Sequence, residues 1–175
     1  MPSPDAQSIT DMHGENEVKQ MKVRFELNGK KVEAETTPYT SLTDMLREEL
    51  DIHSVKKGCE HGECGACTIL FDGLPMTSCI ILAPQVEGHH ITTLEGLERN
   101  PMMIDLRQAF IENGAIQCGF CTPGMLISSY ALLRDNPTPS PEEVKIGIEG
   151  NICRCTGFTK IIEAVLDAAE RIISE

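Results

Sequence analysis

Three cysteines lie close together in a glycine-rich stretch near the middle of the chain. Cys59, Cys64 and Cys67 stand in the segment Gly-Cys-Glu-His-Gly-Glu-Cys-Gly-Ala-Cys-Thr, where their spacing is C-x4-C-x2-C. A fourth cysteine, Cys79, follows after a short interval. Thiolates bind transition metals strongly. These four residues could therefore hold a metal centre if the fold brings them together.

The spacing is that of four thiolates around a plant-type [2Fe-2S] cluster. One loop can supply three ligands only if its backbone bends sharply, and Gly58, Gly62 and Gly65 allow such bends. Structural zinc usually takes two C-x2-C pairs instead. A Rieske centre needs two histidines on one iron, and His61 has no second histidine near Cys79 to complete the pair. The pattern favours the [2Fe-2S] cluster over both.

A second group of cysteines lies in the C-terminal half. It consists of a C-x2-C pair and a C-x-C pair, namely Cys118, Cys121, Cys153 and Cys155. On spacing alone, zinc is a serious alternative to iron here. Each pair precedes a predicted helix start, and helix N-termini stabilise anions and lower thiol pKa values. Two helix ends directed at one anionic cluster would favour iron and sulfur.

The elements before residue 94 predict a β-grasp arrangement, a mixed sheet with one helix across it. Alternating apolar residues from Met21, the hairpin signal Asn28-Gly29 and a returning strand over 32–36 come first. A helix capped by Thr40 or Ser41 should follow. Strands are expected at 68–71, 76–82 and 91–93. Cys79 would then lie in a strand.

After residue 94 the strand signals stop and four helices are predicted, which suggests a small bundle. The first should end near Gly114. Thr122 is the expected N-cap of the second, with Pro123 at its first helical position. Ser140 opens a capping box for the third, and Thr156 should cap the last. The predicted units are a flexible tail over 1–20, a first domain over 21–96 and a helical domain over 97–175.

Composition narrows the possible partners and compartments. The chain has 175 residues, 15 basic and 27 acidic, and a formal charge of -12. So acidic a surface repels phosphate, which makes nucleic acid an unsuitable partner. No secretory signal, and no stretch long enough to span a membrane, is visible. The expected compartment is the reducing cytoplasm, where clustered thiols more often hold metal than form disulfides.

Taken together, the cysteine motifs resemble those of one family. The stretches GCEHGECGACT, SC at Ser78-Cys79, QCGFCTPGM from Gln117 and GNICRCTGF from Gly150 are similar to the iron–sulfur subunit of the molybdenum hydroxylases. That family includes the xanthine dehydrogenases, aldehyde oxidoreductases and carbon monoxide dehydrogenases. The similarity covers about residues 21–172, and all eight cysteines fall at motif positions.

The resemblance implies an α+β chain, with a plant-type ferredoxin-like β-grasp domain followed by a four-helix [2Fe-2S] domain. It implies that all eight cysteines are metal ligands, and that Gln117 and Cys155 approach the molybdopterin of a large partner subunit. The first cluster would face an FAD-binding subunit or another acceptor. Substrate identity would be set by the molybdenum subunit.

The main hypothesis from the sequence is an electron relay between a molybdopterin centre and FAD, with no catalytic residue in this chain. Two motifs for one-electron cofactors, without a flavin, nicotinamide or pterin-binding fold, favour it. Two alternatives remain open at this point. One is a free ferredoxin-type shuttle, and the other is an interaction module held together by zinc.

Overall fold

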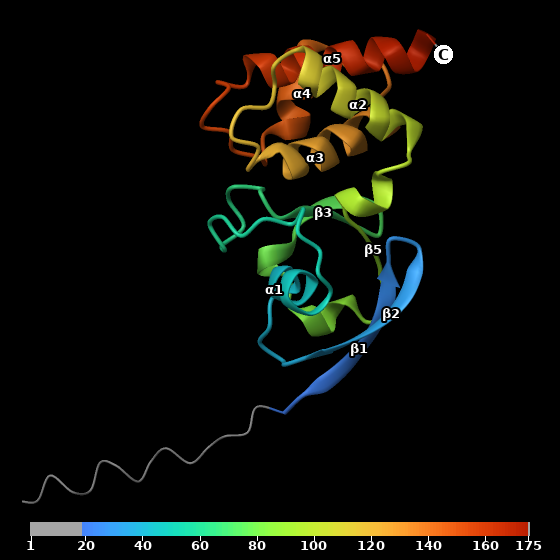
Figure 1. Ribbon diagram of the computed structural model, residues 1–175, viewed down its shortest axis with the longest axis vertical. Helices are drawn as coiled ribbons and strands as arrows, with labels where there is room; N and C mark the ends of the chain where they lie inside the picture. Colours follow the sequence, from blue (N-terminus) through green and yellow to red (C-terminus); the bar gives the residue numbers. More distant parts are fainter. Residues whose placement is uncertain (1–18, 175) are drawn as a thin grey trace, which may run out of the picture.

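The computed structural model describes residues 19–174. Figure 1 shows two stacked parts, with the helices above and the sheet below. Most of the tail expected over 1–20 lies outside the described residues. Within them, the lower part is a five-stranded sheet in the order β2-β1-β5-β3-β4. The strands are β1 (Met21–Leu27), β2 (Lys30–Thr36), β3 (Thr68–Phe71), β4 (Leu74–Thr77) and β5 (His90–Thr92).

The predicted mixed sheet is confirmed. β1 and β2 form an antiparallel hairpin in which Leu27 pairs with Lys30, and both turn residues, Asn28 and Gly29, have positive φ. β1 also pairs in parallel with β5, and β3 pairs antiparallel with both β5 and β4. The alternating residues of β1 bury Val23, Phe25 and Leu27 on one face.

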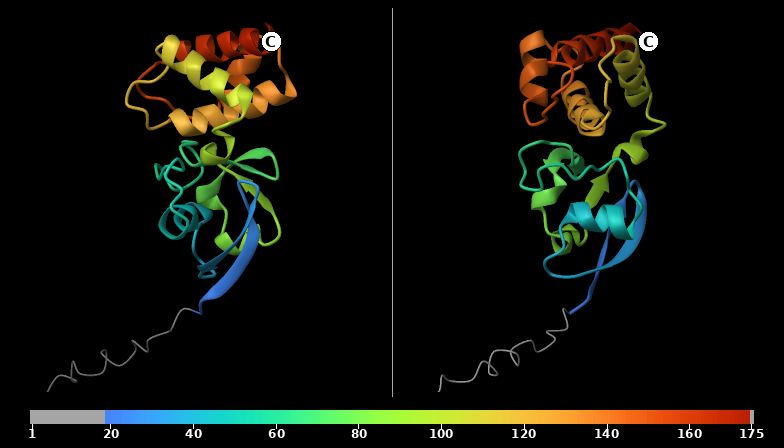
Figure 2. Two further views of the ribbon diagram at one scale, coloured as in Figure 1. Left: turned by 45° about the vertical axis from the view of Figure 1, so that its right-hand side comes forward. Right: turned by 60° about the vertical axis from the view of Figure 1, so that its left-hand side comes forward.

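A short helix covers that face of the sheet. Ser41 caps α1 (Leu42–Asp44), as predicted, because its hydroxyl accepts the Asp44 N–H at 3.1 Å. The helix continues as a π-helical turn over Met45–Glu49. Leu42, Met45 and Leu46 are fully buried in the core under the sheet. Figure 2 shows this helix lying across the long hairpin.

The upper part contains the four predicted helices: α2 (Pro101–Glu112), α3 (Thr122–Asp135), α4 (Pro141–Ile148) and α5 (Thr159–Ser174). They enclose a second hydrophobic core around Phe110, Met125 and Val165, which also takes in Leu70 of β3. The capping box at Ser140 and Glu143 is confirmed. Asn136 ends α3 with its own N–H bonded to the Leu132 carbonyl.

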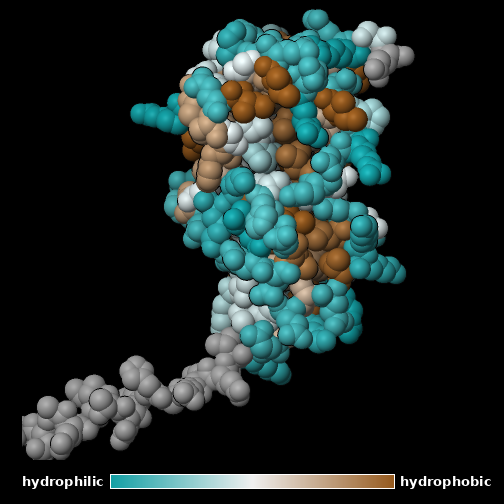
Figure 3. Space-filling view, viewed as in Figure 1, coloured by the Kyte–Doolittle hydropathy of each residue, from teal (hydrophilic) through white to brown (hydrophobic). Residues whose placement is uncertain are grey.

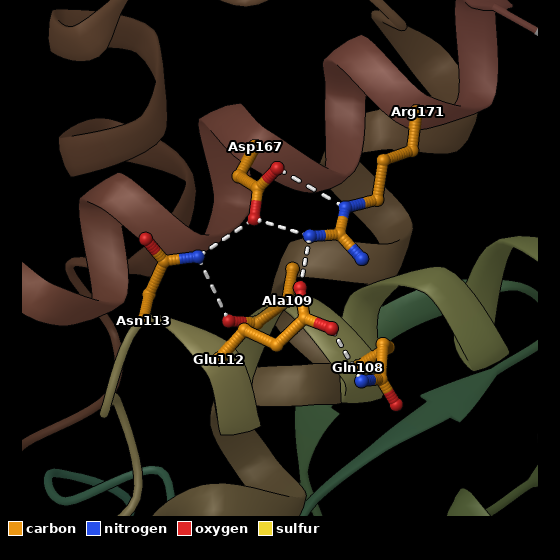
Figure 4. Close-up of polar contacts among 6 residues, drawn as sticks. All are labelled: Gln108, Ala109, Glu112, Asn113, Asp167 and Arg171. Atoms are coloured by element: carbon orange, nitrogen blue, oxygen red, sulfur yellow. Dashed lines mark hydrogen bonds and ion pairs between the residues drawn. The ribbon is translucent and has the colours of Figure 1, made fainter.

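A polar network joins α2 to α5 (Figure 4). Arg171 donates to Asp167 on its own helix and to Glu112 on α2. Asn113 extends the network by donating to Asp167 at 2.7 Å and to the Ala109 carbonyl at 2.9 Å. The Arg171 guanidinium holds the pKa values of both carboxyl groups below their usual range. The network fixes the C-terminal helix on the bundle.

Three local predictions are wrong, and one of them is the N-cap expected at Thr122, which falls on Cys121 instead. The strand expected over 76–82 ends at Thr77, because the Ser78 N–H and hydroxyl both bond to the Cys67 carbonyl and turn the chain into a short 3-10 helix. Thr156 does not cap α5. Gly157 and Phe158 both have positive φ, so the chain makes another turn before the helix begins at Thr159.

Candidate metal centres

The first cysteine loop lies between the π-helical turn and β3. Glu60, Gly62 and Gly65 all have positive φ, and these bends fold the loop back on itself. Cys59 and Cys64 meet as a result. The Cys59 N–H points at Cys64 Sγ and the Cys64 N–H points at Cys59 Sγ, both at 3.4 Å. The loop therefore directs backbone donors at its own sulfurs.

The thiols of this first set differ in their readiness to ionise. Hydrogen bonds from the His61 and Cys64 N–H groups lower the pKa of Cys59 to about 6. Burial raises the pKa of Cys79 to about 12, and the neighbouring Cys67 thiol adds to the rise. A buried thiolate needs positive charge beside it. A metal cation would supply that charge, since metal binding releases the thiol proton.

Cys79 reaches the loop from a 3-10 turn, and not from the expected strand. Ser78, which is fully buried, fixes that turn. Its hydroxyl donates to the Cys67 carbonyl at 2.8 Å and contacts the Thr43 hydroxyl at 2.7 Å. Cys79 is thereby held beside Cys67. Ser78 directly precedes a predicted ligand in the sequence, and a small polar residue at that place is a signal that could have indicated this role.

The second set comes from two connections in the helical part. Cys118 and Cys121 lie between α2 and α3, whereas Cys153 and Cys155 lie between α4 and α5. The Sγ atoms of Cys118 and Cys155 are 3.5 Å apart. All eight cysteines of the chain are free thiols in this structure. The packing of the helices therefore brings together two pairs that are far apart in sequence.

The two predicted helix ends do not lower the thiol pKa values of this set as expected, and the N-cap expected at Thr122 lies one residue earlier. Cys121 is itself the N-cap of α3, and Thr122 is the first helical residue. The other helix, α5, begins only at Thr159, six residues after Cys153, so its N-terminal N–H groups do not provide the donor for this sulfur. The Thr156 hydroxyl replaces it by donating to Cys153 Sγ at 3.1 Å.

Thiol pKa values in this set also diverge. Burial works to raise the pKa of Cys153, but the hydrogen bonds from the Thr156 hydroxyl and N–H outweigh it and the pKa is lowered. The Phe120 N–H lowers the pKa of Cys118. Burial raises that of Cys121 to about 12, and the Cys153 thiol contributes. As in the first set, readily ionised thiols lie beside a buried one.

The two sets border one hollow of ≈210 Å³. Its walls include Cys59 and Cys64 of the first set and all four cysteines of the second. In Figure 1 both regions lie on the same flank, one above the other. The Ile152 N–H donates to the Cys64 carbonyl at 2.9 Å. Since Ile152 directly precedes Cys153, one hydrogen bond links the two sets.

The donor chemistry fits two binuclear clusters. Structural zinc requires four ligands around one ion. The thiols instead lie as close pairs, as the side-chain contacts of Cys59 with Cys64 and of Cys118 with Cys155 illustrate. Two thiolates on each of two irons is the arrangement of a [2Fe-2S] cluster.

The two residues expected near a pterin lie at the surface. Gln117 and Cys155 are both exposed. Phe120 and Ile152, which line the hollow, are apolar and also exposed, at 47% and 56%.

Comparison with known proteins agrees with this geometry. Residues 11–109 match the model of the 2Fe-2S iron-sulfur cluster binding domain, and residues 93–166 match that of a [2Fe-2S] binding domain. The small FeS subunit of nicotinate dehydrogenase from Eubacterium barkeri is 48% identical over 149 residues, which is 85% of this chain and 95% of that subunit. The xanthine dehydrogenase iron-sulfur-binding subunit of Escherichia coli O157:H7 is 44% identical over 81% of this chain and 89% of that subunit.

A solved structure has the same fold. The matching chain of quinoline 2-oxidoreductase from Pseudomonas putida 86 superposes with a TM-score of 0.83 at 43% identity, over 89% of this chain and 97% of that one. Fold and site thus define an iron–sulfur protein with two [2Fe-2S]-binding domains. The chain belongs to the family of small, electron-transferring [2Fe-2S] subunits of the molybdenum hydroxylases.

This membership replaces the free shuttle and the zinc module with a subunit of a larger molybdenum-dependent oxidoreductase complex. No helix among residues 19–174 has the length and apolar character to cross a membrane.

Proposed function

We propose that each cysteine set holds one [2Fe-2S] cluster with two thiolates on each iron. The proposed pairs are Cys59 with Cys64, Cys67 with Cys79, Cys118 with Cys155, and Cys121 with Cys153. The reciprocal N–H to sulfur bonds of Cys59 and Cys64 and the 3.5 Å approach of Cys118 to Cys155 support this pairing. The Cys67 thiol adds to the raised pKa of Cys79, and the Cys153 thiol adds to that of Cys121, so contacts within these pairs support the other two.

The bound clusters supply one-electron redox chemistry, and the protein supplies their placement. The single observation that carries the proposal is the hydrogen bond from the Ile152 N–H to the Cys64 carbonyl, which joins a ligand of one set to the neighbour of a ligand of the other. Backbone donors at Cys59 and Cys118, and the Thr156 hydroxyl at Cys153, stabilise thiolate charge.

We further propose that the second set faces a large molybdopterin-binding subunit, with Gln117 and Cys155 toward the pterin. Exposure of Cys118 and Cys155, and the apolar surface of Phe120 and Ile152 beside them, support a partner at this place. The first set would face an FAD-binding subunit or another acceptor. Exposed Ile80, next to Cys79, provides apolar surface on that side.

The remaining assignments are also proposals. The units are a tail over 1–20, a ferredoxin-like domain over 21–96 and a helical domain over 97–175, and two separate hydrophobic cores support the division. The compartment is the cytoplasm. The substrate is chosen by the large partner subunit.

An iron determination combined with EPR tests the cluster assignment. The purified chain should contain iron and no stoichiometric zinc, and reduction should give two distinct rhombic [2Fe-2S] signals. A single signal, or zinc in place of iron, would overturn the assignment.

Co-purification tests the partners. The chain should purify in a complex with a pterin-binding and a flavin-binding chain encoded beside it, and Phe120→Asp should release the pterin-binding chain. Ile173→Asp is the matched control, because Ile173 is an exposed apolar residue (57%) far along α5. Equal loss in both variants, or a lone chain in the native extract, would contradict the proposed interface.

A further inference from the structure

Asn151 occupies the place where the two cysteine regions touch. It follows Gly150, lies two residues before Cys153, and is only 3% exposed. Burying an amide is unfavourable unless its donors and acceptor are paired. Its partners therefore indicate why the fold keeps an amide here.

The Asn151 side chain bonds to three residues from two segments of the chain. Its Nδ2 group donates to the Gly65 carbonyl at 2.9 Å and to the Thr68 hydroxyl at 3.3 Å. Its Oδ1 atom accepts from the Ser128 hydroxyl at 2.6 Å. The carbonyl of Gly65 can only accept, so the orientation of the amide is fixed by its partners. One side chain thus ties the first cysteine loop to α3, the helix that Cys121 begins.

The backbones at this point approach so closely that two glycines are needed. A Cβ on Gly65 would lie 2.5 Å from Asn151 Nδ2 and would also overlap the Gly150 carbonyl. A Cβ on Gly124 of α3 would overlap the Gly65 carbonyl and lie 2.9 Å from Asn151 Nδ2. The Asn151 amide is therefore closely packed between the backbones at Gly65 and Gly124.

Two neighbouring residues of the second cysteine region bind two neighbouring residues of the first cysteine loop. Asn151 holds Gly65 through its side chain, and Ile152 holds Cys64 through its N–H. No hydrogen bond joins Asn151 to a cysteine sulfur among the described residues. Its effect on the ligands therefore acts through position, and not through their electronic state.

We propose that Asn151 is a positioning residue that fixes the separation and relative orientation of the two clusters. This inference rests on the proposed function, since it assumes one cluster in each set. Electron transfer and the magnetic interaction between two reduced clusters both fall steeply with distance. A looser joint should weaken both without changing the potential of either cluster.

The test is EPR of the fully reduced holoprotein, with Asn151→Ala and Ser128→Ala compared with the wild type. Asn151→Ala should keep full iron content and both midpoint potentials but lose most of the spin–spin splitting, and electron transfer between the clusters should slow severalfold. Ser128→Ala removes one of the three bonds and should give a smaller loss. Ser129→Ala is the matched control, because Ser129 is equally buried and its hydroxyl has no partner within residues 19–174.

The outcomes separate this inference from the proposed function. Absence of two signals in the wild type would refute the cluster assignment itself. Two coupled signals in the wild type, with unchanged splitting in Asn151→Ala, would overturn only the role of Asn151. If Asn151→Ala does not bind both clusters, the Ser128→Ala variant provides the test. A spin–spin splitting in Ser128→Ala equal to that in Ser129→Ala would then overturn the proposal.

Discussion

The first cysteine set takes three of its four thiols from one loop, whereas the second takes two from each of two connections between helices. In the first, the N–H to sulfur bonds join residues five positions apart. In the second, the closest thiols, those of Cys118 and Cys155, lie 37 positions apart. The first site is thus made by local backbone conformation, and the second by helix packing.

This difference also appears in what surrounds the thiols. Positive φ at Glu60, Gly62 and Gly65 shapes the first loop. The second set depends on a helix cap at Cys121 and on a hydroxyl from Thr156. Its thiols are also more exposed, since Cys118 and Cys155 reach the surface. Changes to loop backbone and changes to helix packing should therefore affect the two sites unequally.

The largest expected effect comes from removing a ligand. Cys64→Ser should lose the first cluster and the order of its loop, because metal binding is part of the folding free energy. Cys118→Ser should lose only the second cluster. EPR with iron analysis distinguishes the two variants. Full iron content in Cys64→Ser would show that Cys64 is not a ligand.

A cavity in the helical core should damage the second site selectively. Phe110 of α2 is fully buried, and Phe110→Ala should cost about 3–5 kcal/mol of unfolding free energy. On heating, the second cluster's signal should then disappear at a lower temperature than the first. Ile69→Ala in the sheet core is the counterpart and should reverse the order. Simultaneous loss of both signals in each variant would mean that the two parts unfold as one unit.

Two glycines allow the backbone contribution to be separated from packing between the regions. Gly65 and Gly119 both have positive φ, so backbone strain alone should lower the unfolding free energy by roughly 1–2 kcal/mol when either is replaced by alanine. At Gly119 nothing lies within 4 Å of an added Cβ, but at Gly65 it meets the Gly150 carbonyl and Asn151. Thermal unfolding should therefore show a clearly larger loss for Gly65→Ala. Equal losses would refute the close contact between the regions.

The smallest effect is expected at the network between α2 and α5. Arg171 lowers the pKa values of Asp167 and Glu112, so its contribution is present above their ordinary values of about 4 and is lost as pH falls through the lowered ones. Arg171→Met should lower the Tm near pH 7, and its difference from the wild type should shrink below about pH 4. Arg107→Met is the control for loss of an arginine on this bundle. A difference independent of pH would contradict the ion pairs.

Local signals predicted most of the elements. The hairpin at Asn28 and Gly29, the Ser41 cap and the capping box at Ser140 each depend on neighbouring residues, and each is confirmed. The errors fall where a hydrogen bond to or from a cysteine competes with the expected element. Ser78 ends a strand by bonding to Cys67, and Thr156 turns to a sulfur instead of capping a helix.

The grouping of the cysteines could be predicted because their spacing carries ligand chemistry. The contact between the two cysteine regions at Asn151 could not be predicted from the sequence. The partners of Asn151 lie 23 and 86 positions away, in Ser128 and Gly65, and no periodicity connects such positions. The surface apolar residues do not indicate the position of this joint either. On the face shown in Figure 3, they form separate patches on the helical part and on the sheet part.

The parallel pairing of β1 with β5 has a consequence for the order of events during folding. Glu26 pairs with His90, and the whole first cysteine loop lies between them in the chain. Such non-local pairing forms slowly, because a long segment must first be closed. The sheet therefore cannot close until residues beyond the loop have left the ribosome.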